Sequence, residues 1–247
     1  MSEPILSVRS LSKHFGGVHA LEQVDFDLHQ GEVLALAGDN GAGKSTLIKI
    51  ISGVHQPNEG EIRFRGQSVM FADPRAAREA GIETIYQDLA LADNLDVGAN
   101  VFLGREPMRR ILGLFPALDR PRMAREAVRL IASLDIALPR LDLPVRSLSG
   151  GQRQAVAIGR AIFWNAEVLI MDEPTAALGV PEQRKVVALI RGLRAANKAV
   201  IFISHNLTDI FAVADRIMVL RRGRKAGERI AGDTTGDEIV KLMVGSA

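Results

Sequence analysis

The chain has 247 residues, 47% of them hydrophobic and 24% charged, which is the composition of a globular protein large enough for one large domain or two small ones. It contains no cysteine, no apolar run of the about 18–20 residues that a membrane-spanning helix needs, and no signal-peptide pattern at Met1–Pro4, so we expect a cytosolic protein without disulfides or thiolate metal sites. The net charge of +2 is nearly balanced, and the basic clusters Arg109-Arg110 and Arg221–Lys225 are interpreted as solvated strand ends or loops, so nucleic acid is not an expected partner.

The first elements predicted are strands. Ile5–Arg9 and Val24–Leu28 alternate apolar and polar residues, which is typical of half-buried antiparallel strands. Val33–Ala37 is a continuous apolar run bounded by glycines and predicts a fully buried strand. A glycine-rich loop follows it, and then a helix from about Lys44 to Ser52.

Further strands and helices are expected to alternate along the chain. Short apolar runs predict strands at Ile82–Tyr86, Val168–Met171, Val200–Ile203 and Ile217–Leu220, and helical segments include Pro181–Ala196 and Leu207–Ala214. This alternation favours a mainly parallel sheet with helices on both faces. The sequence from Thr235 to Glu238 resembles a capping box that opens a last helix.

The middle of the chain has a different pattern. No buried strand is evident between about Asp88 and Leu148, and Pro121–Leu134 has helical spacing, with Pro139–Pro144 ending the segment. We therefore expect a helical insert in an α/β core.

Gly38–Ser45 reads Gly-Asp-Asn-Gly-Ala-Gly-Lys-Ser, which matches the phosphate-loop pattern between a buried strand and a helix. Glycines allow a close backbone approach, so that successive amides and the helix N-terminus converge on an anion. Lys44 is expected to reach the β- and γ-phosphates, and the Ser45 hydroxyl to bind Mg²⁺. The sequence predicts binding and hydrolysis of ATP with Mg²⁺.

A pair of carboxylates follows the apolar run Val168–Met171. Ligands of open α/β sheets bind at the carboxyl ends of the strands, so Asp172 is expected to hold Mg²⁺ through water and Glu173 to polarise the attacking water. Alone, this pair equally fits a strand that leaves the core; beside a phosphate loop, the catalytic interpretation is favoured.

A second glycine-rich turn, Ser149–Gln152, opens a helix that is expected to end near Trp164. Two phosphate-binding surfaces that faced one nucleotide within a monomer would be redundant. We therefore predict a head-to-tail homodimer in which each nucleotide lies between Gly38–Ser45 of one chain and Ser149–Gln152 of the other.

These three motifs, with Leu148 before the second turn, occur in the order and spacing of the ABC-transporter ATPase family, which the chain resembles over essentially its whole length. The resemblance implies that Phe15 stacks on adenine, that Gln87 senses Mg²⁺ and the γ-phosphate where the core joins the helical insert, and that His205 contacts the γ-phosphate. In isolation, these three residues would be interpreted as a core aromatic, a polar loop residue and a helix cap.

The predicted fold is α/β: a P-loop NTPase (RecA-like) core with an N-terminal antiparallel β subdomain and an inserted α-helical subdomain. We expect a single ABC ATPase domain over 1–247, with the core at 1–87 and 149–247 and the helical insert at about 88–148. The predicted catalytic residues are Glu173, His205 and Gln87, and the predicted Mg²⁺ ligands are Ser45, Gln87 and Asp172. The predicted nucleotide-binding residues are Phe15, Gly38, Asp39, Asn40, Gly41, Ala42, Gly43, Lys44, Ser45 and Thr46, with Ser149, Gly150, Gly151 and Gln152 acting in trans.

One position departs from the family pattern. Gly179 stands where the family commonly has an acidic residue that couples the two sites of the dimer. The surrounding sequence, Thr175–Val180, is similar to that of bacterial monosaccharide importers, as are the phosphate loop, Gly81–Leu91 and Asn100–Glu106. The single set of motifs is most similar to the single-module subunit of fructose-type importers.

The resemblance implies a peripheral protein on the cytoplasmic face of the inner membrane that energises transmembrane permease subunits and, indirectly, a periplasmic sugar-binding protein. An apolar stretch at Leu89, Leu91, Leu95 and Val97 is expected to form a groove for a short permease helix, although Leu95 and Val97 also fit a core. A GTPase would need Asn-Lys-x-Asp, whereas Asn197-Lys198 lacks the aspartate. The alternative is a soluble ABC ATPase that acts on nucleic acid or ribosomes, but such relatives carry coiled-coil insertions or two fused modules.

Overall fold

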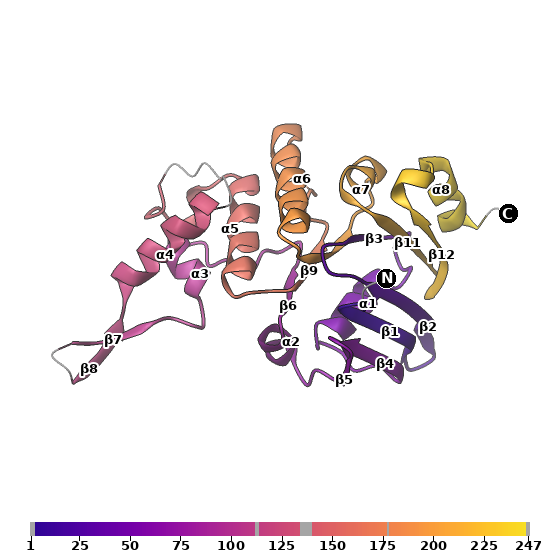
Figure 1. The fold of residues 1–247 in the computed structure, drawn as a ribbon, viewed down its shortest axis with the longest axis horizontal. Coiled ribbons are helices and arrows are strands. Elements are labelled where there is room, and N and C mark those ends of the chain that lie inside the picture. The colour runs from indigo at the N-terminus through magenta and orange to yellow at the C-terminus, as the bar shows by residue number, and fades with distance from the viewer. Residues whose placement is uncertain (1–2, 112–113, 134–139, 177, 246–247) are drawn as a thin grey trace. The chain divides into compact units, whose positions relative to one another are not determined.

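A computed structural model describes residues 3–111, 114–133, 140–176 and 178–245, which form two compact units (Figure 1). The first unit comprises residues 1–87, 166–175 and 190–247, and the second comprises residues 88–165 and 176–189.

The first unit begins with a four-stranded antiparallel sheet in the order β2-β1-β4-β5. Its strands are β1 (Leu6–Phe15), β2 (Val18–Leu28), β4 (Glu59–Phe64) and β5 (Gln67–Val69). The strands predicted at Ile5–Arg9 and Val24–Leu28 are confirmed, except at Ile5, as parts of β1 and β2, whose longer course was not predicted. The hairpin of β4 and β5 was also missed, because each strand is short and only Ile62 and Phe64 in it are buried.

A second sheet in this unit has the order β12-β11-β3-β10-β9-β6, and every neighbouring pair except β11–β12 is parallel. Its strands are β3 (Val33–Ala37), β6 (Ile82–Ile85), β9 (Val168–Asp172), β10 (Ala199–Ile203), β11 (Arg216–Arg221) and β12 (Arg224–Ile230). Each of the five predicted apolar runs forms a strand of this sheet. All residues of β3 and β10 are buried, as expected for strands that are covered on both faces.

Helices cover both faces of the six-stranded sheet, as predicted. In Figure 1, α7 (Leu207–Val213) and α8 (Gly236–Val244) lie on one face, and α1 (Lys44–Ile51) lies on the other with the four-stranded sheet. The predicted capping box opens α8, because the Glu238 amide donates to Thr235 Oγ1 and the Thr235 amide donates to Glu238 Oε2. The unit also contains α2 (Pro74–Ala80) and a short 3₁₀ helix at Ala231–Asp233, and the basic cluster Arg221–Lys225 forms the β11–β12 turn, as interpreted from the sequence.

The second unit is mainly helical. It contains α3 (Val97–Phe102), α4 (Arg120–Ser133), a 3₁₀ helix at Val145–Ser147 and α5 (Gly150–Phe163), while α6 (Val180–Ala195) contributes residues to both units. The helix predicted at Pro121–Leu134 is confirmed by α4, with Leu134 and the predicted stop at Pro139 outside the described residues. A hairpin of β7 (Met108–Ile111) and β8 (Phe115–Leu118) was not predicted; it adds no buried strand, since its described side chains are mostly exposed.

The helices of this unit enclose an apolar cluster of Val97, Val101, Phe102, Met123, Leu130, Ile131, Val145, Leu148 and Val156. Trp164, the single tryptophan of the chain, packs against this cluster in edge contact with Phe102 and Phe163, and its indole N–H donates to the Val101 carbonyl at 2.9 Å.

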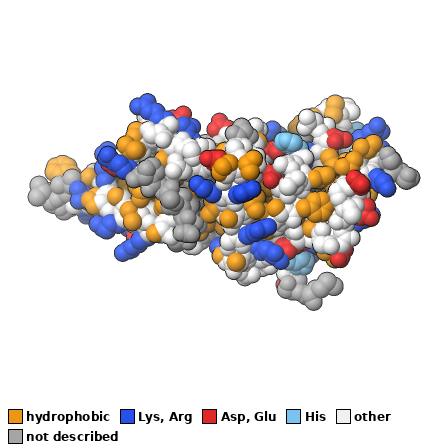
Figure 2. Space-filling model, turned by 90° about the horizontal axis from the view of Figure 1, so that it is seen from above, with side chains coloured by type: hydrophobic (Ala, Val, Ile, Leu, Met, Phe, Trp, Pro, Cys, Tyr) orange, Lys and Arg blue, Asp and Glu red, His pale blue; other side chains and the backbone are white. Residues whose placement is uncertain are grey.

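The surface seen in Figure 2 carries basic, acidic and apolar side chains interspersed with one another. Among the described residues, no helix is both long and apolar enough to cross a membrane.

Asn100 closes the loop that precedes α3. Its side chain is fully buried, accepts from the Ala92 amide at 2.7 Å, and donates to the carbonyls of Ala92, Leu95 and Asp96 at 3.0–3.2 Å. One side chain therefore adds four hydrogen bonds to the backbone of a segment that makes no regular secondary structure.

We expect Asn100→Ala to lower the free energy of unfolding of the second unit by about 1–3 kcal/mol, because it removes a fully buried side chain with four hydrogen bonds and leaves the Ala92 amide without its acceptor. Denaturant unfolding followed by Trp164 fluorescence measures the effect in this unit. Asn94→Ala, an exposed position in the same loop, is the control and should shift stability by less than about 0.5 kcal/mol. Equal unfolding midpoints for the two variants would contradict the role of Asn100.

Candidate functional site

The loop Gly38–Ser45 joins the buried strand β3 to α1, as predicted. Two of its glycines have no substitute: a Cβ at Gly38 would lie 2.3 Å from the Leu220 carbonyl oxygen, and one at Gly43 would lie 2.7 Å from that of Ala20. Gly43 also has φ +106°, a left-handed conformation that L side chains rarely adopt. The chain thus enters α1 directly at Lys44, and the first amides of the helix provide donors for an anion.

Lys44 lies along this loop. Its ammonium group donates to the carbonyl of Gly38 at 2.6 Å and to that of Asp39 at 3.0 Å. Burial lowers the pKa of Lys44, and the carboxylates of Glu173, Asp172 and Asp39 act in the opposite direction. The Lys44 ammonium, which the sequence predicts to bind phosphate, is therefore partly desolvated. This desolvation strengthens its interaction with an anion.

The β11–β12 turn contacts the loop Gly38–Ser45 through the backbone. The Gly223 amide donates to the Ala42 carbonyl at 3.0 Å, and the Gly223 carbonyl accepts from the Glu22 amide at 2.8 Å. Sequence analysis missed this support, although the Arg222-Gly223 pair between two strands is a turn signal. The loop is therefore tied to the β11–β12 turn, which is itself tied to β2.

The parallel strands bring the predicted residues to one edge of the sheet. Ile203 of β10 pairs with both Leu36 of β3 and Asp172 of β9, and β6 pairs with β9 in the same direction. Because the carboxyl ends of parallel strands meet at the same edge, the segments that follow these strands emerge together. That edge carries Gly38–Ser45, Gln87, Asp172, Glu173 and His205.

Glu173 and His205 are in direct contact at this edge. Glu173 Oε2 lies 2.8 Å from His205 Nδ1, and the Glu173 amide donates to the Ile203 carbonyl at 3.0 Å. The Glu173 side chain is 19% exposed and that of His205 is 75% exposed. Asn206, and not His205, is the N-cap of α7, so the helix-cap interpretation of His205 is wrong.

Asp172 is the last residue of β9 and is half-buried. Burial and the adjacent Glu173 raise the pKa of Asp172, whereas Lys44 and Lys49 lower it. No group of three or more His, Cys, Asp or Glu side chains that could hold a metal ion occurs among the described residues. The predicted Mg²⁺ ligands Ser45, Gln87 and Asp172 include one carboxylate, and their role stays a prediction.

Phe15 ends β1 and is 45% exposed, so the interpretation as a core aromatic is wrong. The His55 ring meets it edge-on with centroids 5.3 Å apart, and Lys13 Nζ lies 5.1 Å from its centroid. This arrangement leaves an oriented aromatic surface that can stack on a planar ring.

Ser149–Gln152 lies in the second unit, at the start of α5. The Gln152 amide donates to Ser149 Oγ at 3.3 Å, and the Ser149 amide donates to Gln152 Oε1 at 2.9 Å. This reciprocal capping box was not predicted, although Ser-x-x-Gln is its sequence signature. Gly179 precedes α6 in the same unit, and its small size admits the Glu182 carboxylate, since a Cβ at Gly179 would lie 2.9 Å from Glu182 Oε2.

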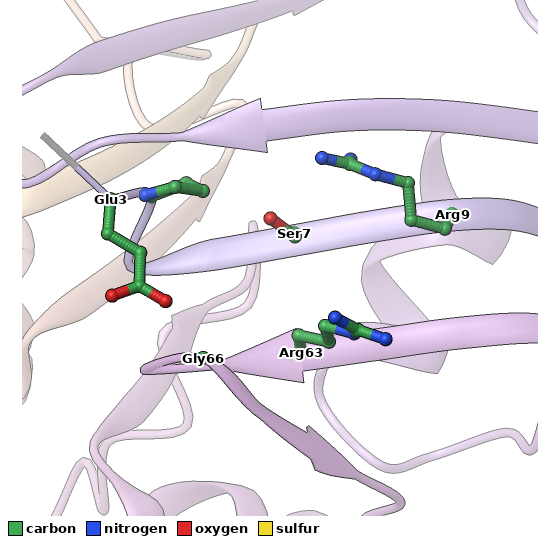
Figure 3. Close-up of a pocket in the computed structure, with 6 residues that line it drawn as sticks. Glu3, Ser7, Arg9, Arg63 and Gly66 are labelled. Atoms are coloured by element: carbon green, nitrogen blue, oxygen red, sulfur yellow. The ribbon is translucent and has the colours of Figure 1, made fainter. Parts of the chain in front are cut away.

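A separate small pocket lies on the four-stranded sheet (Figure 3). It is lined by Glu3, Pro4, Ser7, Arg9, Arg63 and Gly66, none of which is a predicted site residue. Its two arginines pair with carboxylates of the protein, Arg9 with Asp27 and Arg63 with Glu61. We assign no function to it.

The fold and the loop define a P-loop nucleotide-binding protein, and comparison with known proteins gives the family. The family model for ABC transporters matches residues 21–176, and the chain belongs to this family. The predicted resemblance is thereby confirmed.

Three curated relatives carry names of sugar importers. The chain is 47% identical over 243 residues to the xylose/arabinose import ATP-binding protein XylG of Sulfolobus acidocaldarius, with 98% of the chain and 95% of the relative covered. It is 47% identical over 247 residues to the fructose import ATP-binding protein FrcA of Rhizobium meliloti, covering 99% and 95%. It is 42% identical over 243 residues to the ribose import ATP-binding protein RbsA of Caldanaerobacter subterraneus subsp. tengcongensis, covering 98% of the chain but 48% of that relative.

Solved structures of ATP-binding cassettes share the fold. The ADP conformation of MJ1267, a cassette of an ABC transporter, has a TM-score of 0.84 at 25% identity and covers 99% of the chain and 100% of that structure. A dimeric post-hydrolysis state of the cassette MJ0796, bound to ADP and Pi, has a TM-score of 0.75 at 25% identity and covers 92% and 98%. The predicted α/β P-loop fold is confirmed.

We expect Lys44→Ala to raise the dissociation constant for ATP at least about tenfold, because a charge-assisted hydrogen bond contributes about 1.5–3 kcal/mol. Titration with fluorescently labelled ATP measures the change. Lys241→Ala, which removes an exposed lysine of α8, should bind like the wild type. Unchanged affinity in Lys44→Ala would remove Lys44 from the phosphate site.

Proposed function

We propose that the chain is the ATP-hydrolysing subunit of an ABC importer for a monosaccharide. The observation that carries the ATP-hydrolysing part of this proposal is the common sheet edge at which Gly38–Ser45, the carboxylates of Asp172 and Glu173, and His205 follow neighbouring parallel strands. Near full-length similarity to import proteins for xylose/arabinose and fructose supports the direction of transport and the class of cargo.

Hydrolysis at this edge depends on positioning and on electrostatic stabilisation. Backbone amides of the loop and the Lys44 ammonium bind the phosphates and offset the charge that develops on the γ-phosphate. Glu173 polarises the attacking water, and His205, which contacts Glu173, also contacts the γ-phosphate. Phe15 stacks on adenine.

Mg²⁺ fits the donors available. Ser45, Gln87 and Asp172 offer hydroxyl, amide and carboxylate oxygens, and Mg²⁺ typically binds one or two carboxylates together with substrate phosphates. The bound ion would neutralise phosphate charge, and the half-buried Asp172 would be the one carboxylate among its predicted protein ligands.

A second copy of the chain completes each nucleotide site. Ser149–Gln152 of one subunit binds the nucleotide held by Gly38–Ser45 of the other, so ATP closes the dimer and hydrolysis opens it. The dimeric cassette MJ0796 supports this arrangement by analogy.

The chain works as a peripheral subunit at the cytoplasmic face of the inner membrane, on permease subunits that receive sugar from a periplasmic binding protein. The helical insert at about 88–148 transmits the motion. Leu89 and Leu91, both partly exposed, provide the apolar contact for a permease helix. Val97 is fully buried and is removed from this surface. The import relatives do not favour the alternative of a soluble ATPase that acts on nucleic acid or ribosomes.

Co-purification tests the proposal as a whole. The full chain, expressed with a multi-span permease encoded beside it, should form a complex with that permease. In proteoliposomes with this subunit and ATP enclosed in the lumen and the cognate sugar-binding protein added outside, the complex should take up xylose, fructose or ribose. A complex that hydrolyses ATP but moves none of these sugars would refute the sugar class, and failure to bind any permease would refute the importer.

We expect Glu173→Gln to keep ATP binding and to lower turnover by at least about 100-fold, because it removes a general base. Size-exclusion chromatography at saturating ATP should show this variant as a stable dimer. Glu79→Gln, an exposed glutamate on α2, is the matched control and should turn over normally. Normal turnover in Glu173→Gln would remove Glu173 from the base role.

We expect Leu89→Glu to abolish sugar uptake by the assembled transporter while basal hydrolysis by the isolated subunit is retained, because a charge in an apolar contact is left desolvated. Leu91→Glu should do the same with some loss of stability, since Leu91 packs against the apolar cluster of the second unit. Leu118→Glu, at an exposed leucine of β8, is the control. Normal uptake in Leu89→Glu would refute the groove.

A further inference from the structure

Thr175 and Asp209 form a buried polar contact near the candidate site. The Thr175 hydroxyl donates to Asp209 Oδ2 at 2.8 Å, and the two residues are only 3% and 7% exposed. Thr175 follows β9, whereas Asp209 lies in the first turn of α7, after β10. The bond therefore joins two loops that leave neighbouring strands.

These are the loops that carry Glu173 and His205. Glu173 lies two residues before Thr175, and His205 lies four residues before Asp209. Glu173 has φ +52°, a left-handed conformation that is uncommon for a non-glycine residue. Its amide is held by the Ile203 carbonyl, on the strand that precedes His205.

The side-chain contact between Glu173 and His205 is too exposed to hold the two loops in place by itself. The His205 side chain is 75% exposed, and pairs of this kind contribute little in water. The Thr175–Asp209 bond has a carboxylate acceptor and is shielded from solvent, which makes it both stronger and more directional.

We propose that Thr175 and Asp209 are positioning residues, whose hydrogen bond fixes the Glu173 carboxylate against His205 for attack on the γ-phosphate. This inference rests on the proposed function, in which Glu173 polarises the attacking water. It assigns to the pair an effect on the chemical step and none on nucleotide binding, since the phosphate loop leaves a different strand, β3.

Two substitutions at Thr175 test the role of the hydroxyl. Thr175→Val keeps the shape of the side chain and removes the donor, and Thr175→Ser keeps the donor. We expect Thr175→Val to lower turnover at saturating ATP about tenfold or more while the dissociation constant for ATP changes less than about twofold. Thr175→Ser should restore turnover to within about threefold of the wild type.

Turnover is expressed per ATP-binding site, measured by titration with labelled ATP, so that a misfolded fraction lowers the number of sites and not the rate per site. Wild-type turnover in Thr175→Val, or a parallel loss of affinity and turnover that Thr175→Ser does not rescue, would overturn the proposal.

A double variant separates positioning from stability. Thr175→Val combined with Asp209→Leu removes both partners of the hydrogen bond, so neither is left buried without the other and the unfolding midpoint should be close to that of the wild type. If the directional bond positions Glu173, turnover remains low in this stable protein. Wild-type turnover in it would overturn the proposal.

The Glu173→Gln background distinguishes this inference from the proposed function. Since Thr175 acts through Glu173, adding Thr175→Val to Glu173→Gln should cause no further loss of turnover. If Glu173→Gln turns over normally, the assigned base is wrong. If Glu173→Gln is inactive and Thr175→Val is fully active, only the positioning role is wrong.

Discussion

The central position of β10 is the constraint on which the candidate site depends. It pairs in parallel with β3 on one side and with β9 on the other, and all three strands are apolar runs that are almost entirely buried. The register places the ends of the three strands together, and the phosphate loop, the two carboxylates and His205 follow from those ends. Ordinary strand pairing thus brings together groups that lie more than 150 residues apart in the sequence, from Lys44 to His205.

Around this edge, backbone geometry is used in two different ways. In the phosphate loop, positive φ falls on glycines, which adopt it without strain, and the β11–β12 turn holds the loop through the Ala42 carbonyl. At Glu173, positive φ falls on a charged residue, which is unfavourable and has to be held by its neighbours. The buried Thr175–Asp209 bond accounts for how it is held.

Most of the fold could be predicted from the sequence, because buried parallel strands are continuous apolar runs and glycine-rich loops have fixed patterns. Val33–Ala37 and the four later runs all form strands, and α4, α6 and α8 lie where spacing and capping placed them. The β4–β5 and β7–β8 hairpins were missed because exposed strands lack an apolar pattern. Site residues followed from motifs, but the contacts of Gly223, Thr175 and Asp209 depend on tertiary pairing, which no local pattern encodes. The roles in trans remain predictions.

The chain has one tyrosine and one tryptophan, and each compact unit contains one of them. Tyr86 lies in the first unit, directly before Gln87, with its hydroxyl 3.2 Å from Ser52 Oγ, and Trp164 is packed in the second unit. Excitation energy passes from tyrosine to tryptophan with an efficiency that falls steeply with separation. The unmodified protein therefore carries a donor and an acceptor, one per unit, whose transfer efficiency would report any change in their spacing during an ATP cycle without an attached dye.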